Sequence, residues 1–360
     1  MADKKKVLVA MSGGVDSSVT AALLKEQGYD LFGVMMQILP QDEPDPDGSG
    51  GCCSLSAVDD ARRVAQTLDI PFYVMNFRDL FQEKVINYFI QEYLQGKTPN
   101  PCIACNQYVK FSALLHKAMT LGADYVATGH YARVLFDQER GRYLLKKALD
   151  QNKDQTYVLY NFTQDQLSKV LLPLGAYTKP EIRELAHKMN LSLVAEKAES
   201  QEICFIPDNN YRRFLQEKVG QKIKEGPFLD TQGNVIGQHR GVPYYTIGQR
   251  KGLGLALGKP AYVVDILTNK NGVVIGDAED LYKKTLISHH NNFILMDRLE
   301  EPMEVTVKIR YKAQETLAVI SPLENDRVLV EFKEPEKSIT PGQAVVFYQG
   351  EYVVGGGIIE

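Results

Sequence analysis

Short apolar runs alternate with helical patterns through the first 130 residues. The runs predict buried strands at residues 7–10, 31–36, 72–76 and 124–128. Between them, apolar residues recur at helical spacing over 17–27, 59–68, 80–94 and 111–121. Strands that alternate with helices of this length predict an α/β fold with a parallel sheet and crossover helices. Such sheets bind ligands at the carboxyl ends of their strands, which is where Gly13-Gly14 and Gly129-His130 stand.

The pattern changes from about Tyr211, where glycines become frequent and helical periodicity fades. β-rich stretches separated by turn residues follow at 304–311, 316–320, 327–332, 344–348 and 352–359. They predict a small antiparallel β-barrel. We therefore expect a parallel-sheet domain over 1–205, a small connecting domain over 206–285 and the barrel over 286–360. His289 and His290 are adjacent on an expected strand and should point apart.

Composition places the chain among globular proteins, with 44% hydrophobic and 24% charged residues over 360 positions. No apolar run is long enough to span a bilayer, and the N-terminus lacks the pattern of a signal peptide, so we expect a cytoplasmic protein. A net charge of −4 argues against non-specific coating of nucleic acid. It leaves open a structured RNA partner that binds a local basic face.

The segment Ser12-Gly13-Gly14-Val15-Asp16-Ser17-Ser18 follows the first strand and opens the first helix. Adjacent glycines let backbone N–H groups approach an anion, and the N-terminus of a helix favours phosphate. The segment lacks the Gly-Lys-Ser/Thr ending of a Walker A loop, which disfavours a kinase or GTPase. We interpret it as a phosphate-binding loop; a plain strand-to-helix turn is the alternative.

Five cysteines, an odd number with no export signal, argue against a disulfide framework. Cys102 and Cys105 form a C-x-x-C in an expected loop, 96–106, and Cys204 stands alone. A structural zinc site would need a fourth ligand, and no second C-x-x-C is present. Incidental buried thiols and reactive sulfur chemistry remain as the other interpretations. Cys52 and Cys53 follow an acidic Pro/Gly-rich loop, 40–51, and are best interpreted as small residues near a helix start.

The loop at 12–18 resembles the PP-loop of the ATP pyrophosphatase superfamily. Members cleave ATP between the α- and β-phosphates and adenylate a carbonyl-type oxygen, which a nucleophile then displaces as AMP. The resemblance implies an ATP site with Mg²⁺, which neutralises the leaving pyrophosphate. The residues that it implies for ATP binding are Ala10, Met11, Ser12, Gly13, Gly14, Val15, Asp16, Ser17, Met36 and Gly129.

Further motifs resemble those of the tRNA-specific 2-thiouridylases, the MnmA or TrmU family of this superfamily. The matches, in family order, are Thr98-Pro99-Asn100-Pro101-Cys102-Ile103-Ala104-Cys105-Asn106, Ala127-Thr128-Gly129-His130-Tyr131, Asn152-Lys153-Asp154-Gln155, Ile203-Cys204-Phe205-Ile206, Tyr245 to Gly254, Arg310-Tyr311 and Thr340-Pro341-Gly342-Gln343. They span nearly the whole chain, which makes this resemblance far more specific than the loop.

The resemblance implies that ATP adenylates O2 of the wobble uridine in tRNAs for Lys, Glu and Gln, and that sulfur replaces this oxygen. It implies that a donor protein places sulfur on Cys204 as a persulfide, which Cys105 then attacks to leave a disulfide. Many members have Asp where this chain has Cys102. Three thiols at Cys102, Cys105 and Cys204 would also suit a [4Fe–4S] cluster with one open iron, so cluster-dependent transfer stays an equal alternative.

The resemblance also implies contacts to tRNA. It assigns them to Asn100, Pro101, Cys102, Lys153, Asp154, Gln155, Arg310 and Tyr311, with His130 and Gln343 in supporting roles. From the residues themselves, Gln249-Arg250-Lys251 with His239 and Arg240 form a candidate basic contact to RNA phosphates. Two rival functions are an amide-forming PP-loop ligase and a non-catalytic RNA-binding protein with a relic nucleotide loop.

Overall fold

The computed structural model describes residues 4–39, 55–197 and 203–360 of the chain. They divide into two compact units, which we describe separately. The first unit comprises residues 1–85, 102–207 and 351–353, and the second comprises 86–101, 208–350 and 354–360. The acidic loop at 40–51 and the Cys52-Cys53 pair lie outside the described residues. No helix in the described ranges has the length and apolarity needed to cross a membrane.

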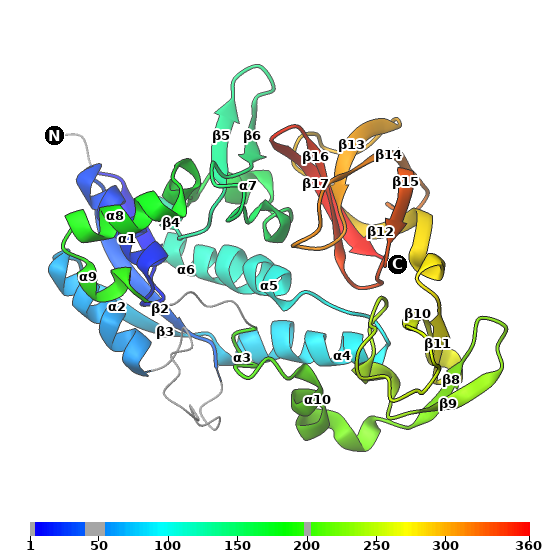
Figure 1. Cartoon of the computed structure of the whole chain (residues 1–360). Helices are drawn as coiled ribbons and strands as arrows, with labels where there is room; N and C mark the ends of the chain where they lie inside the picture. Colours follow the sequence, from blue (N-terminus) through cyan, green and yellow to red (C-terminus); the bar gives the residue numbers. More distant parts are fainter. Residues whose placement is uncertain (1–3, 40–54, 198–202) are drawn as a thin grey trace. The chain divides into compact units, whose positions relative to one another are not determined.

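A parallel five-stranded sheet organises the first unit, in the order β3-β2-β1-β4-β7. Figure 1 labels β2, β3 and β4 of this sheet. Its strands are β1 (Lys6–Ala10), β2 (Asp30–Gln37), β3 (Phe72–Asn76), β4 (Tyr125–Ala127) and β7 (Val170–Leu171). The four predicted strands of the first 130 residues are therefore present. The α/β fold class predicted for this part of the chain is confirmed.

Helices cover both faces of this sheet. Val7 and Val9 face a core shared with α1 (Val15–Glu26), α2 (Leu55–Thr67), α8 (Lys179–Lys188) and α9 (Ser192–Ala195). Leu8 points the other way, into a core with α6 (Leu115–Thr120). This alternation is the period-two pattern of a strand that is buried on both faces.

Two helical stretches cross the boundary between the units in sequence. Residues 78–94 form α3 (Arg78–Phe81), a π-helical segment (Gln82–Asn87) and α4 (Tyr88–Leu94). Residues 101–120 form α5 (Pro101–Ala104), a π-helical segment (Cys105–Leu114) and α6. The C-x-x-C was predicted in a loop, and that is wrong because the helix begins at Pro101, which lies before both cysteines. Proline suits a first helical position, since its fixed φ matches the helix and its missing N–H has no intrahelical partner there.

The first unit also holds elements that the sequence analysis did not predict. They include the hairpin β5 (Arg133–Asp137) and β6 (Arg142–Lys146), the fifth sheet strand β7, the short α7 (Gln164–Leu167), and the α8 and α9 helices. Thr163 and Thr178 begin α7 and α8 with capping boxes.

The second unit contains a four-stranded sheet and a barrel. The sheet has the order β10-β11-β8-β9, from β8 (Gly226–Leu229), β9 (Val235–His239), β10 (Tyr262–Leu267) and β11 (Gly272–Gly276). The barrel strands are β12 (Tyr282–Phe293), β13 (Met303–Lys308), β14 (Thr316–Pro322), β15 (Val328–Lys337), β16 (Ala344–Gln349) and β17 (Tyr352–Ile359). Pairing of β12 with both β15 and β17 closes the barrel, so the predicted antiparallel barrel is confirmed.

Two local expectations in this unit are wrong. Helical structure does not fade at Tyr211, because α10 (Tyr211–Val219) begins there behind Asn210, whose side chain accepts the N–H of Arg213. His289 and His290 do not point apart, because their Nδ1 atoms lie 2.6 Å from one another. His290 has a φ of +50° in a bulged part of β12, which turns its side chain toward that of His289.

Candidate active site

The residues predicted to bind ATP gather at one edge of the parallel sheet. Ala10 ends β1, Met36 lies near the end of β2, and Gly129 follows the end of β4. Because β2, β1 and β4 are adjacent and parallel, their carboxyl ends meet at the same edge. This is the edge where parallel α/β sheets bind ligands.

The Ser12–Ser18 loop has the geometry of an anion cradle. Gly13 has a φ of +74°, and a β-carbon there would come within 2.4 Å of the Ala57 carbonyl oxygen, so only glycine fits. Gly14 precedes α1, and no side chain caps this helix start. The hydroxyl of Ser17 accepts the N–H of Ser12 at 3.1 Å and donates to the Gly14 carbonyl at 3.1 Å. The loop is thus fixed by internal hydrogen bonds, while the positive end of α1 is left for a ligand.

Gly129 lets two chain segments meet behind the loop. A β-carbon on Gly129 would lie 2.9 Å from the β-carbon of Asp16 and 3.0 Å from the nitrogen of Ser17. The glycine in the Ala127–Tyr131 motif therefore sets how close the end of β4 comes to the start of α1.

The carboxylate of Asp16 is held by two residues that sequence reasoning missed for this site. Lys179 Nζ lies 2.7 and 2.8 Å from its two oxygens, and Tyr131 donates its hydroxyl to Oδ1 at 2.6 Å. Lys179 is the first residue of α8, and its side chain is only 8% exposed. No local signal marks it, because it lies 163 positions from Asp16 in the chain.

A second lysine reaches the loop from the end of the first unit. Lys197 donates to the Gly13 carbonyl at 3.2 Å and forms an ion pair with Asp60 of α2. Two lysines from elsewhere in the chain thus contact a loop that itself contains no lysine or arginine.

His130 is buried beside the loop. Its Nδ1 lies 2.7 Å from the Thr128 hydroxyl, and its ring packs against Phe111. Burial, together with the positive charge of Lys110, holds the pKa of His130 well below its ordinary value. The neutral imidazole supports the packing of this segment and does not add positive charge for phosphates.

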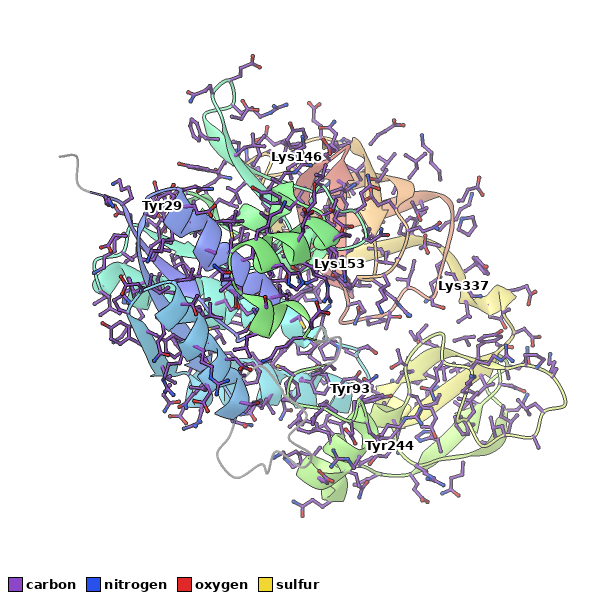
Figure 2. The ribbon with its side chains drawn as sticks, turned by 60° about the vertical axis from the view of Figure 1, so that its left-hand side comes forward. Tyr29, Tyr93, Lys146, Lys153, Tyr244 and Lys337 are labelled. Atoms are coloured by element: carbon purple, nitrogen blue, oxygen red, sulfur yellow. The ribbon has the colours of Figure 1, made fainter. Side chains whose placement is uncertain are left out.

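The Asp150–Gln155 turn, in which Figure 2 labels Lys153, is hydrogen-bonded to Tyr131 and Lys179, the two residues that hold Asp16. Gln155 accepts the Tyr131 N–H on its side-chain oxygen and donates its own N–H to the Tyr131 carbonyl, both at 2.9 Å. Asp150 accepts the N–H of Lys179 at 3.0 Å, and Asp154 accepts the N–H of Ala148 at 2.9 Å. Of the three residues predicted to contact tRNA here, Asp154 and Gln155 therefore have internal roles.

The three cysteines differ in exposure. Cys102 is exposed, Cys105 is buried one helical turn later, and Cys204 is half-buried. No set of three or more His, Cys, Asp or Glu side chains is arranged to hold a metal ion in the part of the chain that the structure describes. That absence concerns a single metal ion, and the [4Fe–4S] site at Cys102, Cys105 and Cys204 stays a prediction.

Comparison with known proteins accounts for the whole chain. The tRNA methyl transferase HUP domain matches residues 5–208, the tRNA methyl transferase PRC-barrel domain matches 212–277, and the aminomethyltransferase β-barrel domain matches 283–359. A tRNA-specific 2-thiouridylase MnmA of Moorella thermoacetica is 60% identical over 353 residues, which cover 98% of this chain and 99% of the relative. The enzyme of the same name from Carboxydothermus hydrogenoformans is 60% identical over 358 residues, covering 99% of this chain and 98% of the relative. The chain belongs to the tRNA-specific 2-thiouridylase family.

Membership of the 2-thiouridylase family confirms the resemblance found in the motifs. The three matched domains also confirm the predicted fold class of a parallel-sheet domain, a connecting domain and a barrel. The boundaries at residues 205 and 285 stay a prediction, as do the individual site residues.

In the second unit, residues of the barrel hold the segment that leads into the C-x-x-C helix. Gln343 donates to the Thr98 carbonyl at 2.7 Å, and Thr98 donates its N–H to the Pro341 carbonyl at 2.9 Å. The Thr98 hydroxyl also lies 3.2 Å from that of Thr246. These contacts fix the chain two residues before Asn100 and Pro101, which is consistent with the supporting role predicted for Gln343.

Arg310 bridges two parts of this unit. Its Nη2 donates to the Ile247 carbonyl at 3.1 Å and to the Ser338 carbonyl at 3.0 Å, and it also contacts the Thr340 hydroxyl. The guanidinium therefore links the Tyr245–Gly254 motif to the barrel. Tyr311, its predicted partner in RNA contact, is 36% exposed.

The glycine-rich segment of the connecting domain forms a hollow of about 220 Å³, lined in part by Arg250 and Lys259. Arg240 is exposed, as a basic contact requires. His239 was included in this contact, and that is wrong, because it is 1% exposed and its Nε2 lies 3.0 Å from the Asn271 carbonyl oxygen. Its ring packs against Phe228 and Tyr245 instead.

Proposed function

We propose that this protein is an ATP-dependent tRNA-uridine 2-sulfurtransferase. It adenylates O2 of the wobble uridine in tRNAs for Lys, Glu and Gln and replaces that oxygen with sulfur, which releases AMP and pyrophosphate. Relatives that are 58–60% identical over nearly the whole chain carry the name tRNA-specific 2-thiouridylase. The observation that carries the proposal is that one unit contains both the anion cradle at Ser12–Ser17 and the thiols Cys102, Cys105 and Cys204.

The first half of the reaction is the adenylation of the uridine, which takes place at the Ser12–Ser18 loop. The uracil O2 attacks the α-phosphorus of ATP, the bond to the β-phosphate oxygen breaks, and N3 gives up its proton. Pyrophosphate leaves into the loop, where the backbone N–H groups at the start of α1 stabilise its charge. Adenylation turns a poor leaving oxygen into AMP.

The thiols perform the second half. A donor persulfide transfers its outer sulfur to Cys204 and leaves as a thiol. Cys105 then attacks the inner sulfur of the Cys204 persulfide, which forms a Cys105–Cys204 disulfide and releases hydrosulfide. Hydrosulfide adds to C2 of the adenylated uridine, AMP departs, and N3 regains a proton. A dithiol reductant restores the two cysteines.

A metal ion assists the first half only. Mg²⁺, when bound, would neutralise the charge on the leaving pyrophosphate. The described residues offer no set of three acidic, His or Cys ligands, so this ion would be held mainly by ATP phosphates and water. A [4Fe–4S] cluster at Cys102, Cys105 and Cys204 stays the alternative to the persulfide route, and the variants below distinguish the two.

The substrate requires a face that binds RNA. The hollow beside Arg250 and Lys259 and the exposed Arg240 offer positive charge for tRNA phosphates. Since tRNA is the substrate, we expect the protein to act in the cytoplasm, together with a sulfur-donor or persulfide-relay protein.

The two rival functions make different demands. An amide-forming ligase would leave the pair Cys105 and Cys204 without a role. A binding protein with a relic loop would have no need of the ion pair between Lys179 and Asp16 beneath that loop. Pyrophosphate exchange into ATP that depends on tRNA would exclude the binding protein.

Thiolation in vitro with single Cys→Ser variants tests the proposal. Cys105→Ser and Cys204→Ser should each lower the rate of 2-thiouridine formation by about 10³-fold or more, since each removes a reacting sulfur. Both variants should retain tRNA-dependent exchange of pyrophosphate into ATP, because adenylation comes first. Cys102→Ser is the matched control, one turn away on the same helix, and should stay within about threefold of the wild type. Loss of thiolation in all three variants, with iron bound after anaerobic reconstitution, would instead favour a cluster.

A further inference from the structure

Lys179 is a buried cation beneath the phosphate loop that the steps above do not use. Its ammonium nitrogen contacts both oxygens of Asp16, and its side chain is 8% exposed. The neighbouring Tyr131 donates to the same carboxylate, and its ring centre lies 5.7 Å from the ammonium. The lysine is therefore fixed against a residue of the loop itself.

The backbone of Lys179 is fixed as firmly as its side chain. Its N–H donates to Asp150, and Thr178 and Glu181 form a capping box around the start of α8. The ammonium thus has little freedom to search for a partner, which is the property expected of a pre-organised binding group.

Stability does not explain a lysine at this place. Lys179 is the first residue of α8, where the helix dipole disfavours positive charge. Burial of the ammonium also removes its hydration, which one carboxylate partner that is 33% exposed offsets only in part. Because the helix dipole and the lost hydration both disfavour an ammonium at this position, we infer that it serves a negatively charged ligand.

We propose that Lys179 binds the pyrophosphate portion of ATP in the Ser12–Ser18 loop, in the role that a lysine within the loop has in Walker A proteins. The inference rests on the proposed function, because it needs ATP in this loop. Asp16 holds the ammonium in place until the nucleotide arrives and then shares it with the phosphate oxygens. Lys179 is therefore a substrate-binding group that contacts the β- and γ-phosphates, which leave together as pyrophosphate.

Affinities for ATP, AMP and pyrophosphate, measured by calorimetry on the full chain without tRNA, test this role. Lys179→Met should weaken ATP and pyrophosphate binding by about 10- to 100-fold, as loss of one charge-assisted hydrogen bond does. AMP lacks these phosphates and should change by less than about threefold. Lys179→Arg keeps the charge and should retain most of the preference for ATP over AMP.

Lys188→Met is the matched control. Lys188 lies on the same helix, is exposed, and pairs with Glu184, so its loss should leave all three affinities unchanged. If Lys179→Met does not fold, Lys179→Gln keeps a polar group against Asp16, and the ratio of ATP to AMP affinity remains the readout.

Two outcomes would overturn the assignment. Equal weakening of ATP and AMP would make Lys179 a structural residue only, and unchanged ATP affinity would remove it from the site. Either result, in a protein whose wild type binds ATP and thiolates tRNA, leaves the proposed function intact. A wild type that forms no 2-thiouridine would instead refute the function.

Discussion

Gln155 and Tyr131 hydrogen-bond to one another twice, through the Gln155 side-chain oxygen and N–H on one side and the Tyr131 backbone on the other. The same tyrosine donates its hydroxyl to Asp16 of the phosphate loop. Gln155 therefore positions a residue of the ATP site, although its motif resembles a tRNA-contact motif. Replacing Gln155 with Ala should weaken ATP binding about 5- to 10-fold in the absence of tRNA, because a bond worth about 1 kcal/mol no longer holds Tyr131. Calorimetric titration with ATP measures this.

Lys153→Ala provides the contrast from the same turn. If Lys153 contacts a tRNA phosphate, its loss should raise the KM for tRNA and reduce the salt dependence of that KM. ATP affinity in the absence of tRNA should not change. If Gln155→Ala raises only the KM for tRNA, then Gln155 contacts tRNA and does not position Tyr131.

Gly129 approaches Asp16 so closely that this position has no room for a side chain. A β-carbon on Gly129 would lie 2.9 Å from the Asp16 β-carbon and the same distance from its carbonyl carbon, so the end of β4 would have to move away from the loop. Gly129→Ala should lower the free energy of unfolding by about 1–3 kcal/mol, as overpacking does, and weaken ATP binding at least about tenfold. Urea unfolding and ATP titration measure the two effects.

Gly122→Ala separates the site effect from backbone strain. Gly122 has a φ of +79°, and nothing lies within 4 Å of an added β-carbon. This variant should lose about 1 kcal/mol of stability and keep its ATP affinity. Equal losses of ATP affinity in both variants would show that the Gly129 effect is general destabilisation.

Much of the parallel-sheet domain was predictable because each strand is a short apolar run set off by helical periodicity. Predicted strand 31–36 is observed as Asp30–Gln37, and 72–76 as Phe72–Asn76. The C-x-x-C helix was not predicted, because two prolines within four residues, Pro99 and Pro101, suggest a loop, although the second begins a helix.

Only those residues of the ATP site that carry a local sequence signal were predictable. The glycine-rich loop and Gly129 are local signals, and the fold brings them together at one edge of the sheet. Lys179 carries no local signal, since its function depends on a contact with Asp16 across 163 positions. Tyr131 lies in a family motif, but its contact with Asp16 spans 115 positions and only the structure reveals it. Family motifs suggested tRNA contact for Gln155 and Arg310, and only the structure reveals their internal bonds.

We expect Arg310 to contribute mainly to the stability of the fold, and less to RNA binding. Its guanidinium donates to the Ile247 and Ser338 carbonyls and contacts Thr340. Arg310→Ala leaves these acceptors without their donor and should lower the free energy of unfolding by about 2–4 kcal/mol. Arg310→Lys keeps the charge but loses the planar fork, so about half of that loss is expected. Urea unfolding of both variants gives the values.

Arg298→Ala is the control within the same unit. Arg298 is exposed and pairs with the exposed Glu300, so its loss should change stability by less than about 0.5 kcal/mol. If Arg310→Ala is as stable as Arg298→Ala and lowers only tRNA affinity, the arginine serves RNA phosphate and not the fold.

His130 should make the protein less stable as the pH falls. Burial and the charge of Lys110 hold its pKa well below the ordinary value of about 6.5, so the folded protein keeps it neutral. Below that pH the unfolded chain binds a proton that the folded chain does not, which lowers stability by up to about 1.4 kcal/mol per pH unit. His130→Asn removes this dependence. The stability difference between wild type and variant should therefore be largest near pH 8 and shrink toward pH 5.

Urea unfolding at several pH values measures that difference, and the contributions of the other histidines cancel because both proteins contain them. His239 and His289 also have lowered pKa values, so wild-type stability alone would not isolate His130. A difference that grows as the pH falls would mean that folded His130 is protonated. The imidazole would then be a cation able to bind phosphate beside the Ser12–Ser18 loop, contrary to its neutral packing against Phe111 and Thr128.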